Sequence, residues 1–201
     1  MVVAVVAAGC GSPGTKKAET QQRTKPQMPA QTQTHLFSPV AMSGETTGVR
    51  LQSAGTGECW IGSLADARPD AWRCMVRNEI LDPCFSGERG TGSDVICTQD
   101  PWSSVKALTL TKPLPRDMAN DRIPDPTTRR PWAIELADGK QCTGLTGATS
   151  VVAGLRINYG CEGGGVLVGE PHRNTAVWTI FFGSSFSART VDSRPISDAW
   201  W

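Results

Sequence analysis

Cysteine is the residue type whose possible chemistry is clearest in this chain of 201 residues, which contains seven cysteines. Cys10 stands alone near the N-terminus, whereas the other six lie between residues 59 and 161. An even set of cysteines in an exported domain is typical of disulfides. Six cysteines can pair in fifteen ways, and we favour pairing between neighbours in the sequence. The expected bridges are Cys59–Cys74, Cys84–Cys97 and Cys142–Cys161.

Metal binding and thiol catalysis are the alternative roles for these cysteines. Zinc sites usually contain closely spaced cysteine pairs, often with histidine, whereas the closest cysteines here are Cys74 and Cys84, with nine residues between them. A catalytic thiol needs a neighbouring base, and His172 is the only histidine in the region that we expect to fold. We therefore predict no metal, no cofactor and no catalytic cysteine.

Hydrolytic chemistry has two further candidates, His172 and the proline-rich segment Asp117–Pro131 with Asp117, Asp121 and Asp125. Paired carboxylates can hydrolyse glycosidic bonds. However, the order of these aspartates does not match a calcium loop, and the chain has no Gly-x-Ser-x-Gly nucleophile motif. We predict no catalytic residue, and we keep a hydrolase with an unconventional site in this loop or around His172 as an alternative.

Tryptophan is the most useful clue to a binding surface, with seven copies against one tyrosine. Trp102 follows Asp100-Pro101 in an expected loop, and Trp200 and Trp201 end the printed sequence. Exposed aromatic rings often anchor partners. We predict binding roles for Trp102 and Trp201, with Trp200 packed on the sheet. The tryptophans predicted to lie in the core are Trp60, Trp72, Trp132 and Trp178.

An apolar run precedes the first cysteine and reads Val2-Val3-Ala4-Val5-Val6-Ala7-Ala8-Gly9-Cys10. Its Ala-Gly-Cys ending resembles the lipobox of bacterial lipoprotein signal peptides. The resemblance implies a signal peptide over residues 1–9 and a lipid on Cys10 that anchors the chain to the outer face of the cell membrane. Because a transmembrane helix needs roughly 20 apolar residues, this lipid is the only anchor that we expect. No Lys or Arg precedes the run, so we expect translation to start upstream of Met1.

The chain divides by composition into a tether and a folded region. Residues 10–46 contain few large apolar side chains, so we predict a disordered, lipid-anchored tether. Residues 47–201 are predicted to form a single disulfide-containing domain. The net charge is +1 and charged residues make up 19 % of the chain, so no strongly basic face for nucleic acid is expected.

Short strands separated by glycine, proline and Asp/Asn turns predict a mainly β fold, a compact antiparallel sheet or barrel. The Asp138-Gly139 dipeptide lies between two strand-like segments and predicts a hairpin. One short helix is expected over residues 69–77, because Pro69 and Asp70 suit a first helical turn. Together these elements give a disulfide-stapled β fold with a minor helical part.

Four segments of the folded region resemble those of exported, cysteine-rich actinobacterial proteins. They are Ala71-Trp72-Arg73-Cys74, Leu81-Asp82-Pro83-Cys84-Phe85, Pro131-Trp132-Ala133-Ile134-Glu135-Leu136 and Asn158-Tyr159-Gly160-Cys161. This resemblance implies export and disulfides but transfers no function. We predict a cell-envelope lipoprotein that acts as a non-enzymatic binding or interaction module for an envelope polymer or another exported protein. The alternatives are the hydrolase above and an accessory or sensory domain of a membrane partner.

Overall fold

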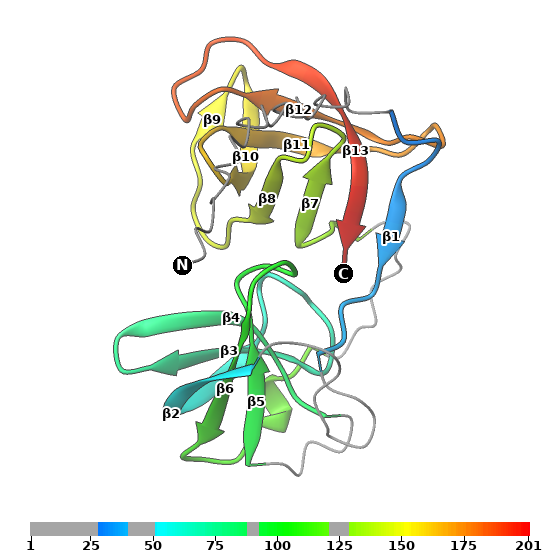
Figure 1. Cartoon of the computed structure of the whole chain (residues 1–201). Helices are drawn as coiled ribbons and strands as arrows, with labels where there is room; N and C mark the ends of the chain where they lie inside the picture. Colours follow the sequence, from blue (N-terminus) through cyan, green and yellow to red (C-terminus); the bar gives the residue numbers. More distant parts are fainter. Residues whose placement is uncertain (1–27, 40–50, 88–92, 121–128) are drawn as a thin grey trace, which may run out of the picture.

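The computed structural model of the chain describes residues 28–39, 51–87, 93–120 and 129–201. Within these residues the fold is mainly β, as the sequence predicts, and the strands form two separate closed sheets. Figure 1 shows one sheet above the other, with the C-terminus near the boundary between them. We call the sheet of residues 51–110 the first barrel and the sheet of residues 133–200 the second barrel.

The first barrel closes because its first and last strands pair in parallel, while its other neighbours are antiparallel. Its interior holds a cluster of buried apolar residues around two disulfides. Its strands are β2 (Leu51–Gly62), β3 (Ala71–Val76), β4 (Glu79–Phe85), β5 (Asp94–Cys97) and β6 (Val105–Leu110).

The prediction of a helix over residues 69–77 is wrong, because residues 71–76 form strand β3. Trp72, Cys74 and Val76 are buried, whereas Met75 between them is exposed. This alternation has a period of two residues, which is typical of a strand. The single helical turn in the described residues is η1 (Arg116–Met118).

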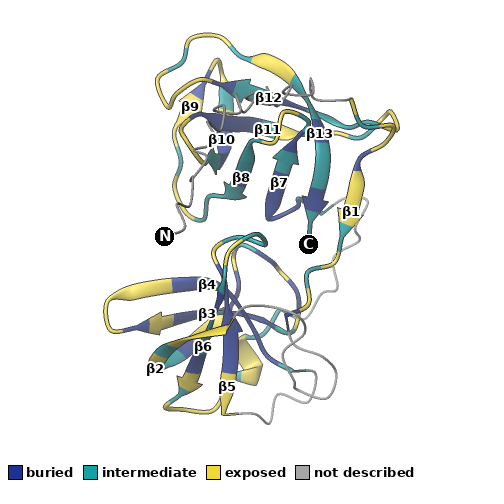
Figure 2. Cartoon of the chain, viewed as in Figure 1, coloured by how far each residue is buried: buried dark blue, intermediate teal, exposed yellow. Residues whose placement is uncertain are grey.

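The second barrel closes because β7 pairs with both β8 and β13. Its core comprises two clusters of buried apolar residues, and Figure 2 shows these positions along the strands. The hairpin predicted at Asp138-Gly139 joins β7 to β8, and Gly139 has a φ of 82°. Its strands are β7 (Ala133–Leu136), β8 (Gln141–Gly144), β9 (Val151–Val152), β10 (Leu155–Cys161), β11 (Val166–His172), β12 (Thr179–Gly183) and β13 (Asp192–Trp200).

Part of the predicted tether is ordered, in contrast to the prediction of disorder over residues 10–46. Residues 28–39 run along the second barrel, where β1 (Gln33–His35) pairs in parallel with β13. The buried Thr32 fixes this segment, because its hydroxyl donates to the Ile196 carbonyl and accepts from the Trp178 amide. Long-range hydrogen bonds of this kind leave no signature in local composition. Cys10 lies outside the described residues.

The structure pairs the cysteines as Cys59–Cys74, Cys84–Cys97 and Cys142–Cys161, the three bridges predicted from the sequence. Each bridge joins residues that lie directly opposite each other on antiparallel strands. Such disulfides indicate an oxidising environment outside the cytoplasm.

Two of the bridges lie side by side in the first barrel, where the sulfurs of Cys74, Cys84 and Cys97 are within 4.8 Å of one another. Because all three are disulfide-bonded, they offer no thiolate to a metal. Among the described residues, no helix combines the length and the apolar character needed to cross a membrane.

Candidate functional site

Phe37, which follows strand β1, packs between the two barrels. Its ring lies 5.6 Å from that of Phe85 in the first barrel and 5.6 Å from that of Trp132 in the second. Its amide donates to the carbonyl of Trp201, and its own carbonyl accepts from Arg68. One aromatic side chain thus contacts the cores of both barrels, which fixes them next to each other.

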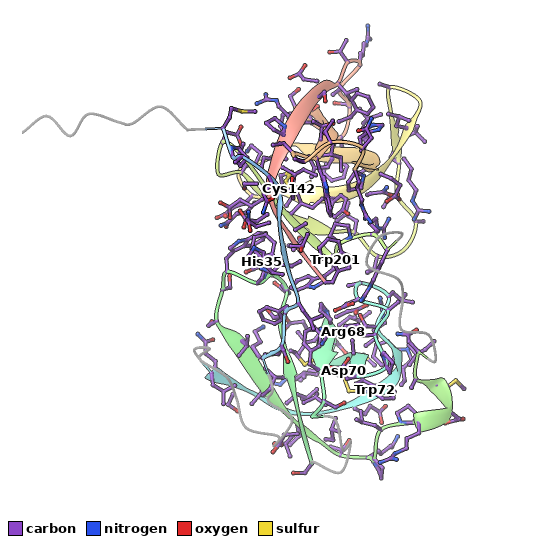
Figure 3. All side chains as sticks on the ribbon, turned by 90° about the vertical axis from the view of Figure 1, so that its right-hand side faces the viewer. His35, Arg68, Asp70, Trp72, Cys142 and Trp201 are labelled. Carbon is purple, nitrogen blue, oxygen red and sulfur yellow. A yellow bond between two sulfur atoms is a disulfide. The ribbon has the colours of Figure 1, made fainter. Side chains whose placement is uncertain are left out.

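Buried charges reinforce this contact. Arg68 binds Asp70 through Nε at 3.1 Å and Nη2 at 2.9 Å, and its guanidinium lies 4.7 Å from the Phe85 ring centroid. Asp66, which is buried in the first barrel, forms an ion pair with Arg129 at the start of the second. Burial lowers the pKa of Arg129 to about 10, so this residue is still charged at neutral pH. In Figure 3, Arg68 and Asp70 lie below the boundary between the barrels, and His35 and Trp201 lie above it.

Beside this contact lies the main cavity of the described structure, with a volume of about 420 Å³. Drug-sized ligands occupy clefts of a few hundred Å³ or more. Residues of the first barrel form one wall and residues of the second barrel form the other, and we call this cavity the cleft. Its lining consists of Asp100, Trp102, Ser103, Gln141, Thr143, Gly160, Cys161, Glu162, Gly164, Gly165 and Phe186.

The first wall is the connection between β5 and β6, which is shaped by Asp100. One carboxylate oxygen accepts hydrogen bonds from the amides of Trp102, at 2.9 Å, and Ser103, at 2.6 Å. The other oxygen accepts from the Ser103 hydroxyl at 2.8 Å. These three donors from its own loop occupy the carboxylate, so Asp100 shapes the wall and has little capacity left to contact a ligand.

Trp102 is held in this wall by other aromatic rings. It contacts Trp200 edge to face with centroids 4.9 Å apart, and Trp200 stacks on His35 at 4.9 Å. His35 Nε2 in turn lies 2.7 Å from the Asp198 carboxylate. The indole nitrogen of Trp102 is buried and finds no acceptor among the described residues, so packing alone orients the ring. The ordered end of the predicted tether therefore supports the cleft wall.

The second wall is formed by β8, β10 and the glycine-rich turn that follows β10. Gly164 and Gly165 have φ values of 96° and 94°, which residues with a Cβ rarely adopt. Nothing lies within 4 Å of the place where a Gly164 side chain would be, so a ligand can approach the backbone there, whereas the ring of Phe182 fills that place at Gly165. Within the described part of the chain, neither the Thr143 hydroxyl nor the Glu162 carboxylate has a hydrogen-bond partner. The exposed ring of Phe186 completes the rim.

A second cavity of about 160 Å³ adjoins the first. The two share Asp100 and Ser103, so the hollow surface continues past this loop toward Lys106. Lys106, which lines the second cavity, forms a 3.1 Å ion pair with Glu79. We call the two cavities, joined through Asp100 and Ser103, the groove.

The structure agrees with some of the predicted tryptophan positions and disagrees with others. Trp102 lines the cleft, so its binding role stays a prediction. Trp201 is only 5 % exposed and packs against Trp178, so the prediction of a free binding residue is wrong. Trp60, predicted to lie in the core, is 38 % exposed because β2 has an irregular register between Cys59 and Ile61. Trp72 and Trp132 are buried, as predicted.

The structure describes only part of the alternative hydrolytic set. His172 ends β11 with its ring exposed against Phe181, and no carboxylate of the described residues pairs with it. Asp117 lies in η1, while Asp121 and Asp125 are outside the described residues.

Most of the cleft was not predicted from the sequence. Thr143, Glu162 and Phe186 carry no sequence motif. The arrangement depends on contacts between the barrels, which local patterns do not reveal. The Asp100-Pro101-Trp102 sequence was the only usable signal, since it places an aromatic ring in a loop.

Comparisons with known proteins give no guide to the function, so the function must be inferred from the structure. No family model matches the chain, and no curated protein and no solved structure resembles it.

Proposed function

We propose that this chain is a non-enzymatic binding module of the cell envelope, which holds its ligand in the cleft between the two barrels. We further propose that a lipid on Cys10 anchors it to the outer face of the membrane. The observation that carries the proposal is the cleft, because it combines two aromatic rings with unpaired polar groups. Its walls are fixed by the contacts of Phe37 and Arg68.

Binding is favoured over catalysis by the chemistry of the lining. Asp100 is occupied by three hydrogen bonds from its own loop, and no histidine lines the cleft. A general acid or base must be free to exchange a proton with the ligand. Glu162 is the one carboxylate in the lining without a partner in the described structure, and it has no second group to work with.

Co-sedimentation with insoluble actinobacterial cell-wall material tests the binding role. We expect Phe186→Ala to reduce the bound fraction, because this ring is 57 % exposed at the cleft rim. The matched control is Leu64→Ala, which removes an apolar side chain of 54 % exposure outside the cleft lining. Equal binding by the wild type and both variants would refute the cleft as the binding site.

The anchor requires a separate measurement, the intact mass of the protein extracted from membranes. We expect a chain that begins at Cys10 and carries a lipid. A chain without lipid that retains Met1 would contradict the anchor and leave the cleft proposal untouched.

A further inference from the structure

We infer that the ligand of the cleft is an uncharged, linear oligosaccharide whose sugar rings lie along the groove formed by the two adjoining cavities. This inference rests on the proposed function and specifies the ligand class of the same site. Three independent features of the groove support it: the charge of its lining, its pattern of aromatic and polar groups, and its length.

The charge of the described lining disfavours anionic ligands. Among the described residues, the lining of the main cavity includes two carboxylates, Asp100 and Glu162, and no Lys or Arg. The Lys140 ammonium lies just outside this lining, where it donates to the carbonyls of Glu162 and Gly164. Phosphates and carboxylates are usually recognised by Arg, Lys or a set of free backbone amides. Lys106 in the second cavity is neutralised by Glu79. A neutral ligand is compatible with this lining, since it brings no charge that must be paired.

The lining also mixes flat apolar surfaces with short polar groups. Trp102 and Phe186 offer aromatic rings, while Thr143, Gln141 and Ser103 offer hydroxyl and amide groups. A sugar ring has the complementary surface, with C–H bonds on its faces and hydroxyls at its edge. The backbone of the glycine turn adds little to this pattern, because the carbonyls of Glu162 and Gly164 accept from Lys140 and the amide of Gly164 donates to Cys161.

The length of the groove indicates more than one sugar unit. The main cavity holds about 420 Å³, and the second adds about 160 Å³ beyond Asp100 and Ser103. A single compact ligand fills only one of these cavities. A linear chain can place consecutive rings on both sides of the Asp100–Ser103 loop.

An extended peptide is disfavoured by the pairing of the strands around the cleft. Peptides that bind a sheet usually add a strand to a free edge. Here β8 pairs with β7 and β10, and β10 pairs with β8 and β11. Neither strand that borders the main cavity has a free edge for such an addition.

Calorimetric titration with a panel of neutral oligosaccharides tests the inference, using gluco-, chito-, xylo- and manno-oligosaccharides from monosaccharide to hexasaccharide. We expect at least one series to bind, with affinity that rises with length until both cavities are filled. Binding is expected to be the same at low and high salt, because neither the ligand nor the contacts rely on charge.

Two substitutions of Phe186 separate ring stacking from general apolar contact. Phe186→Tyr keeps the ring and should retain binding, whereas Phe186→Leu should weaken it roughly tenfold, as expected for a lost aromatic contact. Thr143→Val removes a hydroxyl at nearly constant volume and should weaken binding about fivefold. Both positions are solvent-accessible, and circular dichroism will verify that each of the three variants is folded.

The outcomes distinguish the ligand class from the binding site itself. If no oligosaccharide binds or competes, but Phe186→Ala still reduces co-sedimentation with cell-wall material, the cleft stands and the sugar inference fails. If a cationic peptide binds instead, with an affinity that falls with salt and with Glu162→Gln, the ligand is a basic protein segment. If a monosaccharide binds as tightly as the longest chain, the extended groove is refuted.

Discussion

Trp201 offers the sharpest test of how the barrels are built, because the sequence predicted a free aromatic residue and the structure buries it. Its side chain is only 5 % exposed. Its indole Nε1 donates to the Arg129 carbonyl at 3.3 Å, and its ring meets Trp178 edge to face at 5.9 Å. We therefore predict that Trp201→Ala destabilises the protein strongly.

The magnitude follows from the loss of one large buried side chain. Replacing a buried tryptophan with alanine costs about 3–5 kcal/mol, which includes its hydrogen bond and its aromatic contact. Because Trp201 follows β13 and does not lie in the barrel centre, the surroundings can relax more easily, so we expect about 3 kcal/mol. With a urea slope of about 2 kcal/mol per M, the midpoint of unfolding should fall by about 1.5 M.

The matched control is Trp60→Ala, which changes the same residue type on the outer surface of the first barrel. Trp60 is 38 % exposed and has only a distant guanidinium, that of Arg73, 5.9 Å from its ring. We expect a cost of about 1 kcal/mol or less. Both variants lose one tryptophan, so far-ultraviolet circular dichroism is the appropriate probe, with the disulfides kept intact.

The reasoning would be refuted if both variants unfolded at the same urea concentration. If Trp201→Ala also abolished ligand binding while the fold stayed intact, Trp201 would be a surface contact, as first predicted from the sequence. If the two barrels unfold in separate steps, the unfolding curve will show two transitions. The stability lost in Trp201→Ala should then appear only in the transition of the second barrel.

Two further predictions concern the second barrel. Replacing Cys142 and Cys161 together with serine should destabilise the protein by about 3 kcal/mol, because their bridge closes a loop with a sequence separation of 19; an unchanged melting temperature would argue against this bridge. Gly165→Ala should destabilise more than Gly164→Ala, although both residues have positive φ, because the added Cβ would lie 2.5 Å from the Phe182 ring only at Gly165. Equal melting temperatures for the two glycine variants would contradict the packing at this turn.

Local signals in the sequence were sufficient for the features that depend on neighbouring residues. The Asp138-Gly139 hairpin forms because its turn chemistry dictates antiparallel pairing. The disulfides join sequence neighbours because short connections place antiparallel strands side by side, so that Cys142 lies opposite Cys161. The mainly β fold followed from the same repeated pattern of short strands and turns.

Features that depend on distant contacts could not be predicted. Residues 71–76 suited both a helix and a strand by composition, and pairing with β2 and β4 decided the strand. Strand β1 exists because the pairing of β13 with β12 ends at Pro195, which leaves Asp198 to Trp200 open on that side to a segment far away in the sequence. The cleft needs both barrels in contact, and this contact depends on Phe37, which lies in a segment predicted to be disordered.

The most direct test of the central claim is a map of ligand contacts from backbone amide spectra of the isotopically labelled protein. The spectra are recorded with and without solubilised cell-wall fragments. We predict shifts confined to the Asp100–Ser103 loop, β8, the Cys161–Gly165 turn and Phe186, which line the cleft. Shifts clustered instead on the outer surface around Trp60 and Ile61, with the cleft unaffected, would contradict the account.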